Sequence, residues 1–181
     1  TRKESSAASD VYKRQDKLQQ FVYRSGTFMK PIFQIAKATP PDLKRIVYAE
    51  GEEERVLRAV QVVVDEKLAK PILIGRPAVL AQRIERFGLR LKPDVDFTII
   101  NPEHDDRYRD FWQTYLAMTT RKGVTEQYAK LEMRRRHTLI GAMAIHKKYA
   151  DGMICGTFGT NDLHLHYVEQ VLGKRAGVNV Y

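Results

Sequence analysis

The residues with the clearest chemical potential lie at positions 155–166, in the stretch CGTFGTNDLHLH, after an apolar run typical of a buried strand. The stretch holds the single cysteine of the chain, together with two glycines, one acid and two histidines. These residue types can bind a metal, supply a nucleophile or hold an anion at the start of a helix. Their spacing decides among these three kinds of chemistry.

The spacing argues against a metal site. A helix that starts at Asn161 advances about 100° per residue, so His164 and His166 point about 200° apart and cannot share one ion. His164 falls within the apolar arc and is expected to be a core histidine with satisfied hydrogen bonds, whereas His166 falls on the polar face. Cys155 is expected to be a buried small hydrophobe, because nothing in the sequence supplies it with a base.

What remains is a loop of glycine, threonine and asparagine whose amides and hydroxyls could hold an anion. The stretch AEGEEER, residues 49–55, also places a glycine between a strand and a helix. Three glutamates are expected at that helix N-terminus, where they would repel a phosphate: Glu52, Glu53 and Glu54. This stretch is therefore expected to be a structural turn with an acidic first helical turn, and Arg55 and Arg58 are the ligand-facing exceptions. No G-x-x-x-x-G-K-[ST] motif occurs in the sequence.

The elements that must position these loops alternate along the chain. Strands are predicted at residues 45–49, 71–75, 97–100 and 152–156. Helices are predicted at residues 52–67, 77–87, 105–120 and 138–149, in a segment capped by Thr125, and from Asn161 or Asp162 to Leu172. The alternation predicts an α/β fold with three layers and a mostly parallel sheet. Ligands bind beyond the carboxyl ends of such strands, so AEGEEER and CGTFGTND are the two loops to examine.

Composition and charge pattern argue against two classes of partner. The net charge is +9, but the basic residues are interleaved with acids. The only dense basic run is Arg134, Arg135 and Arg136, which we expect to be a solvated helix face or an oligomer contact; we expect no nucleic-acid partner. The longest apolar run, residues 138–145, is far shorter than the roughly twenty residues of a membrane span. One cysteine and the lack of a signal peptide predict a cytoplasmic protein.

Three stretches resemble the phosphate acetyltransferase/butyryltransferase family. They are RIVYAEGEEERVLRAVQVVVDEKLAKPILIGRP, KGVTEQYA and ADGMICGTFGT, in the order expected of that family. The similarity extends over residues 30–181. It implies an isocitrate/isopropylmalate dehydrogenase-like fold of two subdomains with a cleft between them, of which this chain supplies the first subdomain only.

A further stretch, FVYRSGTFMKPIF at residues 21–33, resembles the connector that joins the catalytic region of bacterial NADP-dependent malic enzymes to a C-terminal phosphotransacetylase-like domain. We therefore expect residues 1–15 to be a non-native tail, residues 16–33 a connector, and residues 34–181 the truncated N-terminal part of that domain. The resemblance implies NADP and Mg²⁺ or Mn²⁺ in the parent enzyme and none in this chain.

The resemblance also implies which residues meet a ligand. The catalytic serine, arginine and aspartate of the family lie outside this chain, so no catalytic residue and no metal ligand is expected here. Two arginines that hold CoA or acetyl phosphate align with Thr119, four residues before Gly123, and with His166. The nearby Arg121 could take over the first of these roles. The expected cleft residues are Thr119, Arg121, Thr157, Gly159, Thr160, Asn161 and His166.

These expectations lead to one hypothesis with two alternatives. The domain would bind acetyl-CoA or a related CoA thioester as an effector, without turning it over, and would regulate the malic enzyme catalytic domain in the same chain. The alternatives are an active phosphate acetyltransferase and an oligomerisation module. A homo-oligomer is expected. A sheet cut before its last strands would expose an edge and apolar surface, which predicts poor solubility.

Overall fold

The structure is a computed structural model that describes residues 29–38, 44–174 and 176–177. The chain divides into two units, Thr1–Pro40 and Pro41–Tyr181. The first unit contributes one described helix, α2 (Met29–Ala38), which was not predicted from the sequence. The expected tail, residues 1–15, and residues 16–28 of the expected connector lie outside the described residues.

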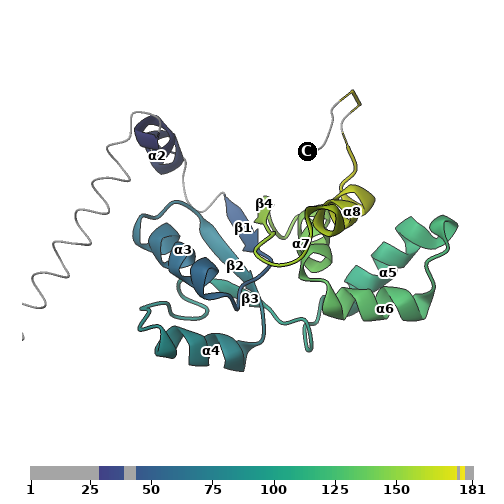
Figure 1. Cartoon of the computed structure of the whole chain (residues 1–181), viewed down its shortest axis with the longest axis horizontal. Coiled ribbons are helices and arrows are strands. Elements are labelled where there is room, and N and C mark those ends of the chain that lie inside the picture. The colour runs from purple at the N-terminus through teal and green to yellow at the C-terminus, as the bar shows by residue number, and fades with distance from the viewer. Residues whose placement is uncertain (1–28, 39–43, 175, 178–181) are drawn as a thin grey trace, which may run out of the picture. The chain divides into compact units, whose positions relative to one another are not determined.

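The second unit is built on a four-stranded sheet (Figure 1). The strands are β1 (Arg45–Tyr48), β2 (Lys70–Ile74), β3 (Thr98–Ile100) and β4 (Gly152–Ile154), in the order β3-β2-β1-β4. All the pairings between them are parallel. The predicted α/β class and parallel sheet are therefore confirmed. The last strand is two residues shorter than predicted, because the chain turns toward Glu50 after Ile154.

Alternate side chains of each strand enter two separate cores, and this makes three layers. One core receives Val47, Ile72, Ile74 and Ile100. The other receives Tyr48, Leu73 and Ile99. Because successive residues of a strand point to opposite faces, helices must cover both faces of the sheet. Val47, Leu73 and Ile74 are fully buried, so the strands lie at the centre of the unit.

Helices α3 (Glu54–Asp65) and α4 (Pro77–Arg86) cover one face of the sheet. Each buries two residues at helical spacing: Leu57 and Val60 in α3, and Leu80 and Ile84 in α4. Pro77 opens α4 as predicted, at a position where its missing N–H is no loss. Helix α3 begins later than predicted, so only Glu54 of the three glutamates lies in its first turn.

The other face carries α5 (Tyr108–Thr119), α6 (Glu126–Arg135), α7 (His137–His146) and α8 (Asn161–Val171), with the short 3-10 helix η2 (Thr120–Lys122) after α5. Helix α7 contacts β1, β2 and β4 directly. Its residues 138–144 are all buried, as expected of a helix that is apolar on every side. Thr125 caps α6 as predicted, because its side chain accepts a hydrogen bond from the Tyr128 backbone.

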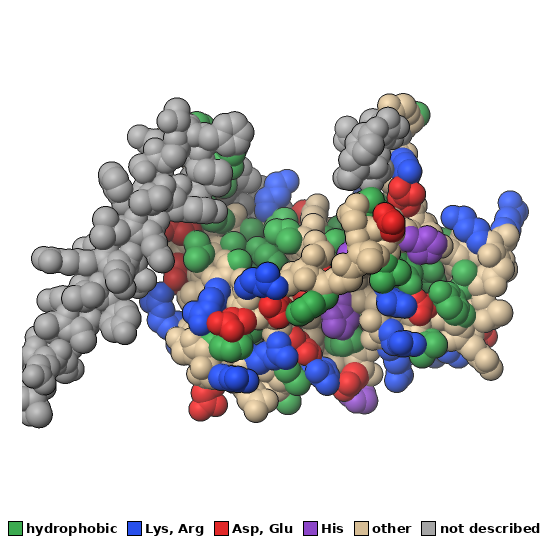
Figure 2. Space-filling model, viewed as in Figure 1, with side chains coloured by type: hydrophobic (Ala, Val, Ile, Leu, Met, Phe, Trp, Pro, Cys, Tyr) green, Lys and Arg blue, Asp and Glu red, His purple; other side chains and the backbone are tan. Residues whose placement is uncertain are grey.

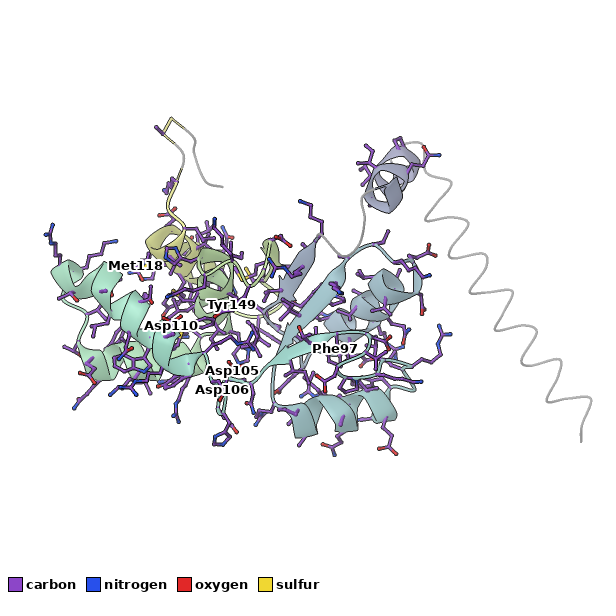
Figure 3. The ribbon with its side chains drawn as sticks, turned by 180° about the vertical axis from the view of Figure 1, so that it is seen from behind. Phe97, Asp105, Asp106, Asp110, Met118 and Tyr149 are labelled. Atoms are coloured by element: carbon purple, nitrogen blue, oxygen red, sulfur yellow. The ribbon has the colours of Figure 1, made fainter. Side chains whose placement is uncertain are left out.

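Helix α5 begins at Tyr108, three residues later than predicted. The Asp105 carboxylate accepts hydrogen bonds from the Arg107 backbone at 2.9 Å and from its guanidinium at 2.7 Å, which holds the chain in a turn before the helix. The Arg107 guanidinium lies 5.5 Å from the centre of the Tyr149 ring. Figure 3 shows Asp105 and Asp106 where the chain passes from β3 into α5.

Two buried tyrosines link α8 to its neighbours. The Tyr115 hydroxyl donates to Gln170 Oε1 at 2.8 Å, and the Tyr167 hydroxyl donates to Oε2 of Glu132. The same oxygen of Glu132 accepts from Arg136 Nε at 3.1 Å. Burial raises the pKa of Tyr115 to about 12, and burial with the Glu132 hydrogen bond raises the pKa of Tyr167. Both phenols therefore remain donors at neutral pH, and they join α8 to α5 and α6.

Candidate functional site

The sheet reverses its direction of winding between β1 and β4, and two loops meet at this point. The chain moves from β1 through β2 to β3 and then places β4 on the opposite side of β1. Open α/β sheets bind ligands at the carboxyl ends of strands beside such a switch point. Ala49 N donates to Ile154 O at 3.0 Å, and Gly156 N donates to Glu50 Oε1 at 3.1 Å. The structure thus brings together the two loops singled out from the sequence.

The loop after β1 is fixed against β2 and α4. Gly51 N donates to Ile74 O at 3.2 Å, and a Cβ at Gly51 would lie 2.7 Å from that oxygen, so the position requires glycine. Glu52 Oε1 accepts from the Arg76 backbone N at 2.8 Å, and the carboxylate accepts from the Arg76 guanidinium at 3.0 and 2.9 Å. These bonds hold the pKa of Glu52 below its usual range. Glu52 is therefore committed to joining this loop to α4.

A cavity of ≈ 210 Å³ opens at the carboxyl edge of the sheet. Its lining residues are Glu50, Glu52, Glu53, Arg83, His137 and Phe158. Arg83 Nη1 donates to the backbone oxygen of Glu52. Glu53 pairs with Arg55 at 3.3 Å, and Arg58 pairs with Glu54 at 2.8 Å. Arg55 and Arg58 are exposed and do not line the cavity, and their ligand-facing role stays a prediction.

His137 brings an imidazole into the cavity. Burial lowers the pKa of His137, while Glu52, Glu50 and a hydrogen bond with the Ala49 backbone act in the opposite direction. At neutral pH the ring is therefore uncharged, and a neutral imidazole has one donor and one acceptor nitrogen. The cavity combines this ring with one guanidinium and with carboxylates, a mixture suited to a ligand that carries both an anionic group and hydrogen-bond donors.

His164 holds the loop that follows β4. Its Nδ1 lies 2.6 Å from Thr138 Oγ1 on α7, and its Nε2 lies 2.5 Å from the backbone oxygen of Phe158. The predicted satisfied histidine is confirmed, although its side chain is half-buried. Gly159 has φ 92° and passes close to this ring, where a Cβ would lie 3.1 Å from Nε2. Through these contacts His164 places Phe158 at the cavity.

Cys155 lies just beyond β4 and is half-buried, so the prediction of a buried strand residue is wrong. Burial and the nearby Glu50 carboxylate raise the pKa of its thiol, and a hydrogen bond with Thr138 acts in the opposite direction. The sulfur is therefore protonated at neutral pH and is a poor nucleophile. Within residues 29–38, 44–174 and 176–177, no three His, Cys, Asp or Glu side chains are grouped so that they could hold a metal ion.

The residues predicted to bind a ligand lie around the loop after β4 and at the end of α5. The first group consists of Thr157, Gly159, Thr160 and Asn161 together with His166, which is exposed on α8. Thr160 is the N-cap of α8, and its side chain makes no capping hydrogen bond. The predicted caps, Asn161 and Asp162, are wrong because the helix already begins at Asn161.

The second group consists of Thr119 and Arg121. Thr119 is fully buried, and its hydroxyl donates to Tyr115 O at 2.6 Å. Arg121 is exposed on η2, where no ion pair with another described residue involves it. None of the seven predicted residues lines the cavity of ≈ 210 Å³. Their role in ligand binding stays a prediction.

Two lining residues, Arg83 and His137, lie outside both loops singled out from the sequence and were not predicted. A local signal exists for Arg83, because it interrupts the apolar stripe of α4 between Leu80 and Ile84. A permanent cation on a helix face that packs against a core needs a specific partner. His137 gives a weaker signal, since it is the polar first residue of the apolar helix α7.

The face of the molecule drawn in Figure 2 shows no concentration of one charge. Figure 2 shows Lys and Arg side chains lying among Asp and Glu on this face of the molecule. A second void, lined by Ile100, Phe111, Met133 and Ile140 among others, has only ≈ 10 Å³, which barely admits one water molecule. No helix in the described part of the chain is long and apolar enough to span a bilayer.

Two solved phosphotransacetylases share this fold. The EutD phosphotransacetylase from Staphylococcus aureus matches with a TM-score of 0.72 at 22% sequence identity. A phosphotransacetylase from Streptococcus pyogenes matches with a TM-score of 0.71 at 25% identity. Each match covers 84% of this chain and 45% of the phosphotransacetylase chain. The fold is thus that of a phosphotransacetylase, of which this chain corresponds to less than half.

The family described as Phosphate acetyl/butaryl transferase matches residues 27–181, and the chain belongs to this family. An NAD-dependent malic enzyme from Rhizobium meliloti is 50% identical over 163 residues, which are 90% of this chain and 21% of that protein. An NADP-dependent malic enzyme from Escherichia coli is 47% identical over 170 residues, 94% of this chain and 22% of that protein. A phosphate acetyltransferase from Nitratidesulfovibrio vulgaris is 29% identical over 149 residues. The chain spans about a fifth of the length of these relatives.

Proposed function

We propose that this chain is an acetyl-CoA-sensing, non-catalytic phosphotransacetylase-like domain of a malic enzyme. Its similarity to malic enzymes and to phosphate acetyltransferases supports this proposal. Acetyl-CoA, or a related CoA thioester, acts as an effector of the malic enzyme catalytic domain in the same chain. Such coupling requires that the effector bind two states of the enzyme with different affinities, a difference typically of about 1–3 kcal/mol.

Two positions, 119 and 166, carry the non-catalytic part of the proposal. The resemblance to active acetyltransferases assigns them arginines that hold CoA or acetyl phosphate. Here Thr119 is fully buried, and its hydroxyl is bonded to its own helix. His166 is exposed, and an imidazole lacks the permanent charge and the planar fork of donors that a guanidinium offers. Losing two charge-assisted contacts would weaken the binding of a phosphoryl group by roughly 1.5–3 kcal/mol each.

The composition of the cavity supports the same conclusion. Arg83 is the only arginine among its lining residues, beside three glutamates. One guanidinium can bind one oxyanion, but acyl transfer to phosphate requires the phosphate and the charge that develops on the thioester to be held together. The described residues therefore favour binding over turnover.

The parent enzyme in this proposal oxidises and decarboxylates malate to pyruvate and CO₂. A divalent metal, Mg²⁺ or Mn²⁺, would polarise the substrate oxygen, and a nicotinamide cofactor would accept the hydride. The similar malic enzymes include an NAD-dependent and an NADP-dependent protein, and we propose NADP here. The residues for these groups are assigned to the part of the parent outside this chain. A cytoplasmic location and a homo-oligomeric state belong to the same proposal.

Two alternatives each have one supporting observation. An active phosphate acetyltransferase is favoured by Arg121, because this exposed guanidinium close to position 119 could replace the missing arginine. An oligomerisation module is favoured by α6, whose Tyr128 and Leu131 side chains are about half exposed. A stable assembly that never binds acetyl-CoA would support the module.

The decisive experiment is malate-dependent NADPH formation by the full-length parent, titrated with acetyl-CoA at subsaturating malate. Phosphate is then added, and acetyl phosphate is assayed. We expect a saturable change in rate and no acetyl phosphate. A flat rate with acetyl phosphate present would instead establish the acetyltransferase, and Arg121→Gln should then abolish that activity.

A further inference from the structure

Arg83 forms no salt bridge with a carboxylate of the described residues, although its charge contributes to the lowered pKa of Glu52. It lies on α4 between the buried Leu80 and Ile84, and its guanidinium donates to the backbone oxygen of Glu52. The carboxylate of Glu52 is already occupied, because it accepts three hydrogen bonds from Arg76. No ion pair of Arg83 occurs in the part of the chain that the structure describes.

The hydrogen bond to Glu52 also fixes where the guanidinium lies. Arg83 is half-buried and lines the cavity, so its remaining N–H donors are held at the cavity wall. A guanidinium presents these donors as a rigid planar fork that fits the two oxygens of a carboxylate or a phosphate. Because the side chain is already ordered, binding an anion would lose less conformational entropy than at a mobile surface arginine.

Other lining residues present acceptors. Glu50 accepts one hydrogen bond from Gly156 N, which leaves further lone pairs of its carboxylate for donors of a ligand. No ion pair of Glu50 is found among the described residues. The neutral ring of His137 can complete such a contact, and the Phe158 ring, more than half exposed, supplies an apolar surface. The cavity therefore places the Arg83 guanidinium beside the Glu50 carboxylate, which has acceptor positions left for a ligand.

We propose that Arg83 binds an oxyanion of the ligand in this cavity, while Glu50 accepts a hydrogen bond from an N–H or O–H group of the same ligand. The inference rests on the proposed function only for the identity of that ligand, a CoA thioester. The cavity of ≈ 210 Å³ is smaller than the roughly 300–1,000 Å³ of common ligand pockets. It therefore takes one phosphate-bearing end of the CoA thioester, or a small free oxyanion of the same chemistry.

The test is isothermal titration of the full-length polypeptide with acetyl-CoA and, separately, with inorganic pyrophosphate. We compare wild type with Arg83→Gln, Arg83→Lys and Arg86→Gln. Arg86 is a matched control, because it is an exposed arginine one turn further along α4 that does not line the cavity. We expect Arg83→Gln to weaken binding about tenfold or more, Arg83→Lys to weaken it less, and Arg86→Gln to leave it unchanged.

The outcomes separate this inference from the proposed function. If wild type and Arg83→Gln bind acetyl-CoA equally well, the proposed role of Arg83 is wrong, while the proposed acetyl-CoA-sensing function stands. If wild type binds pyrophosphate but not acetyl-CoA, and Arg83→Gln no longer binds pyrophosphate, the proposed sensing function is wrong, while the role of Arg83 as an oxyanion ligand stands. Equal losses in Arg83→Gln and Arg86→Gln would overturn the inference, as would no binding of either probe. Should Arg83→Gln unfold, Arg83→Lys decides: weaker binding at an unchanged melting temperature supports the inference, and unchanged binding refutes it.

Discussion

Two glutamates of α6 each stand four residues before a basic residue, but they differ in burial. Glu132 is 3% exposed and pairs with Arg136, whereas the exposed Glu126 pairs with Lys130. Glu132→Ala would leave the Tyr167 hydroxyl and Arg136 without their acceptor. We expect the free energy of unfolding to fall by about 3 kcal/mol. Glu126→Ala, the matched control, is expected to cost less than about 1 kcal/mol.

Urea unfolding followed by the fluorescence of Trp112, the only tryptophan of the chain, measures both effects. Trp112 lies in α5 and belongs to the same core as Tyr167, so its signal reports on the layer that the substitution perturbs. Equal losses for the two variants would show that the buried network contributes no more than a surface ion pair.

The ionisation of Glu52 makes the free energy of unfolding depend on pH. Hydrogen bonds from Arg76 lower its pKa below the ordinary value of 4.5. A carboxyl group whose pKa is lowered by folding stabilises the protein above its unfolded pKa, and this stabilisation is lost as the pH falls through the folded pKa. At neutral pH we expect the free energy of unfolding of wild type to exceed that of Glu52→Gln by on the order of 1.5 kcal/mol. The melting temperatures of the two proteins, measured from neutral pH down to about pH 3, should converge as the pH falls below 4.5. A difference in melting temperature that does not change with pH would exclude ionised Glu52 as its source.

At the residue scale, local spacing predicted that the hydrogen bonds of His164 are satisfied, but it did not predict that Arg83 lines the cavity. The side of α8 on which His164 lies follows from the helical period alone, and both of its ring nitrogens have partners. Arg83 lines the cavity because α4 packs beside the loop after β1, which lies about 30 residues away in the chain. Cys155 was misjudged for a similar reason, since the end of β4 depends on Glu50.

Helix caps supply a test at the element scale. The Thr125 side chain accepts a hydrogen bond from Tyr128 N at 3.3 Å, while the Thr160 side chain makes no capping bond. We expect Thr125→Ala to lower the free energy of unfolding by about 1 kcal/mol, and Thr160→Ala to cost clearly less. Chemical denaturation of the two variants beside wild type measures the difference. A larger loss in Thr160→Ala would mean that Thr160, also a predicted ligand residue, has a structural role.

Element boundaries were predictable where the signal is local. Pro77 and Thr125 each define a helix start through their own backbone or side chain, and both predictions are confirmed. The start of α3 was predicted too early, because the Glu52 side chain is drawn away to Arg76. The start of α5 was also too early, since Asp105 forms a turn with Arg107. In both cases a hydrogen bond to a specific partner outweighs helix propensity.

At the scale of the whole molecule, β4 forms one edge of the described sheet. It pairs only with β1 among the described strands, and Ile154 at its end is 55% exposed. Edge strands with apolar side chains promote association, and lysine blocks it. We expect Ile154→Lys to reduce self-association, measured by light scattering at matched concentrations. Val95→Lys is the control, because Val95 is 78% exposed in the turn before β3; an equal effect there would point to net charge rather than to the edge.

The sequence predicted the three layers, and it could not predict the cavity. The alternation of strands and helices follows from local sequence patterns. The two cores follow because successive side chains of each strand point to opposite faces of the sheet. The cavity forms only when β4 returns to the far side of β1, which brings Phe158 and His137 to the loop that holds Glu50. The switch-point rule indicated the two loops, but it gave no information about the helices that close the walls.

The hydrogen bonds of His164 have a fixed direction. Because the carbonyl oxygen of Phe158 can only accept, Nε2 carries the proton, and in the neutral ring Nδ1 accepts from the Thr138 hydroxyl. The single hydrogen of the Thr138 hydroxyl is therefore committed to His164, and the Nε2 hydrogen of His164 is committed to Phe158. Donation runs in one direction, from α7 through the ring to the loop after β4, so a side chain at position 138 without a donor would leave Nδ1 without a partner.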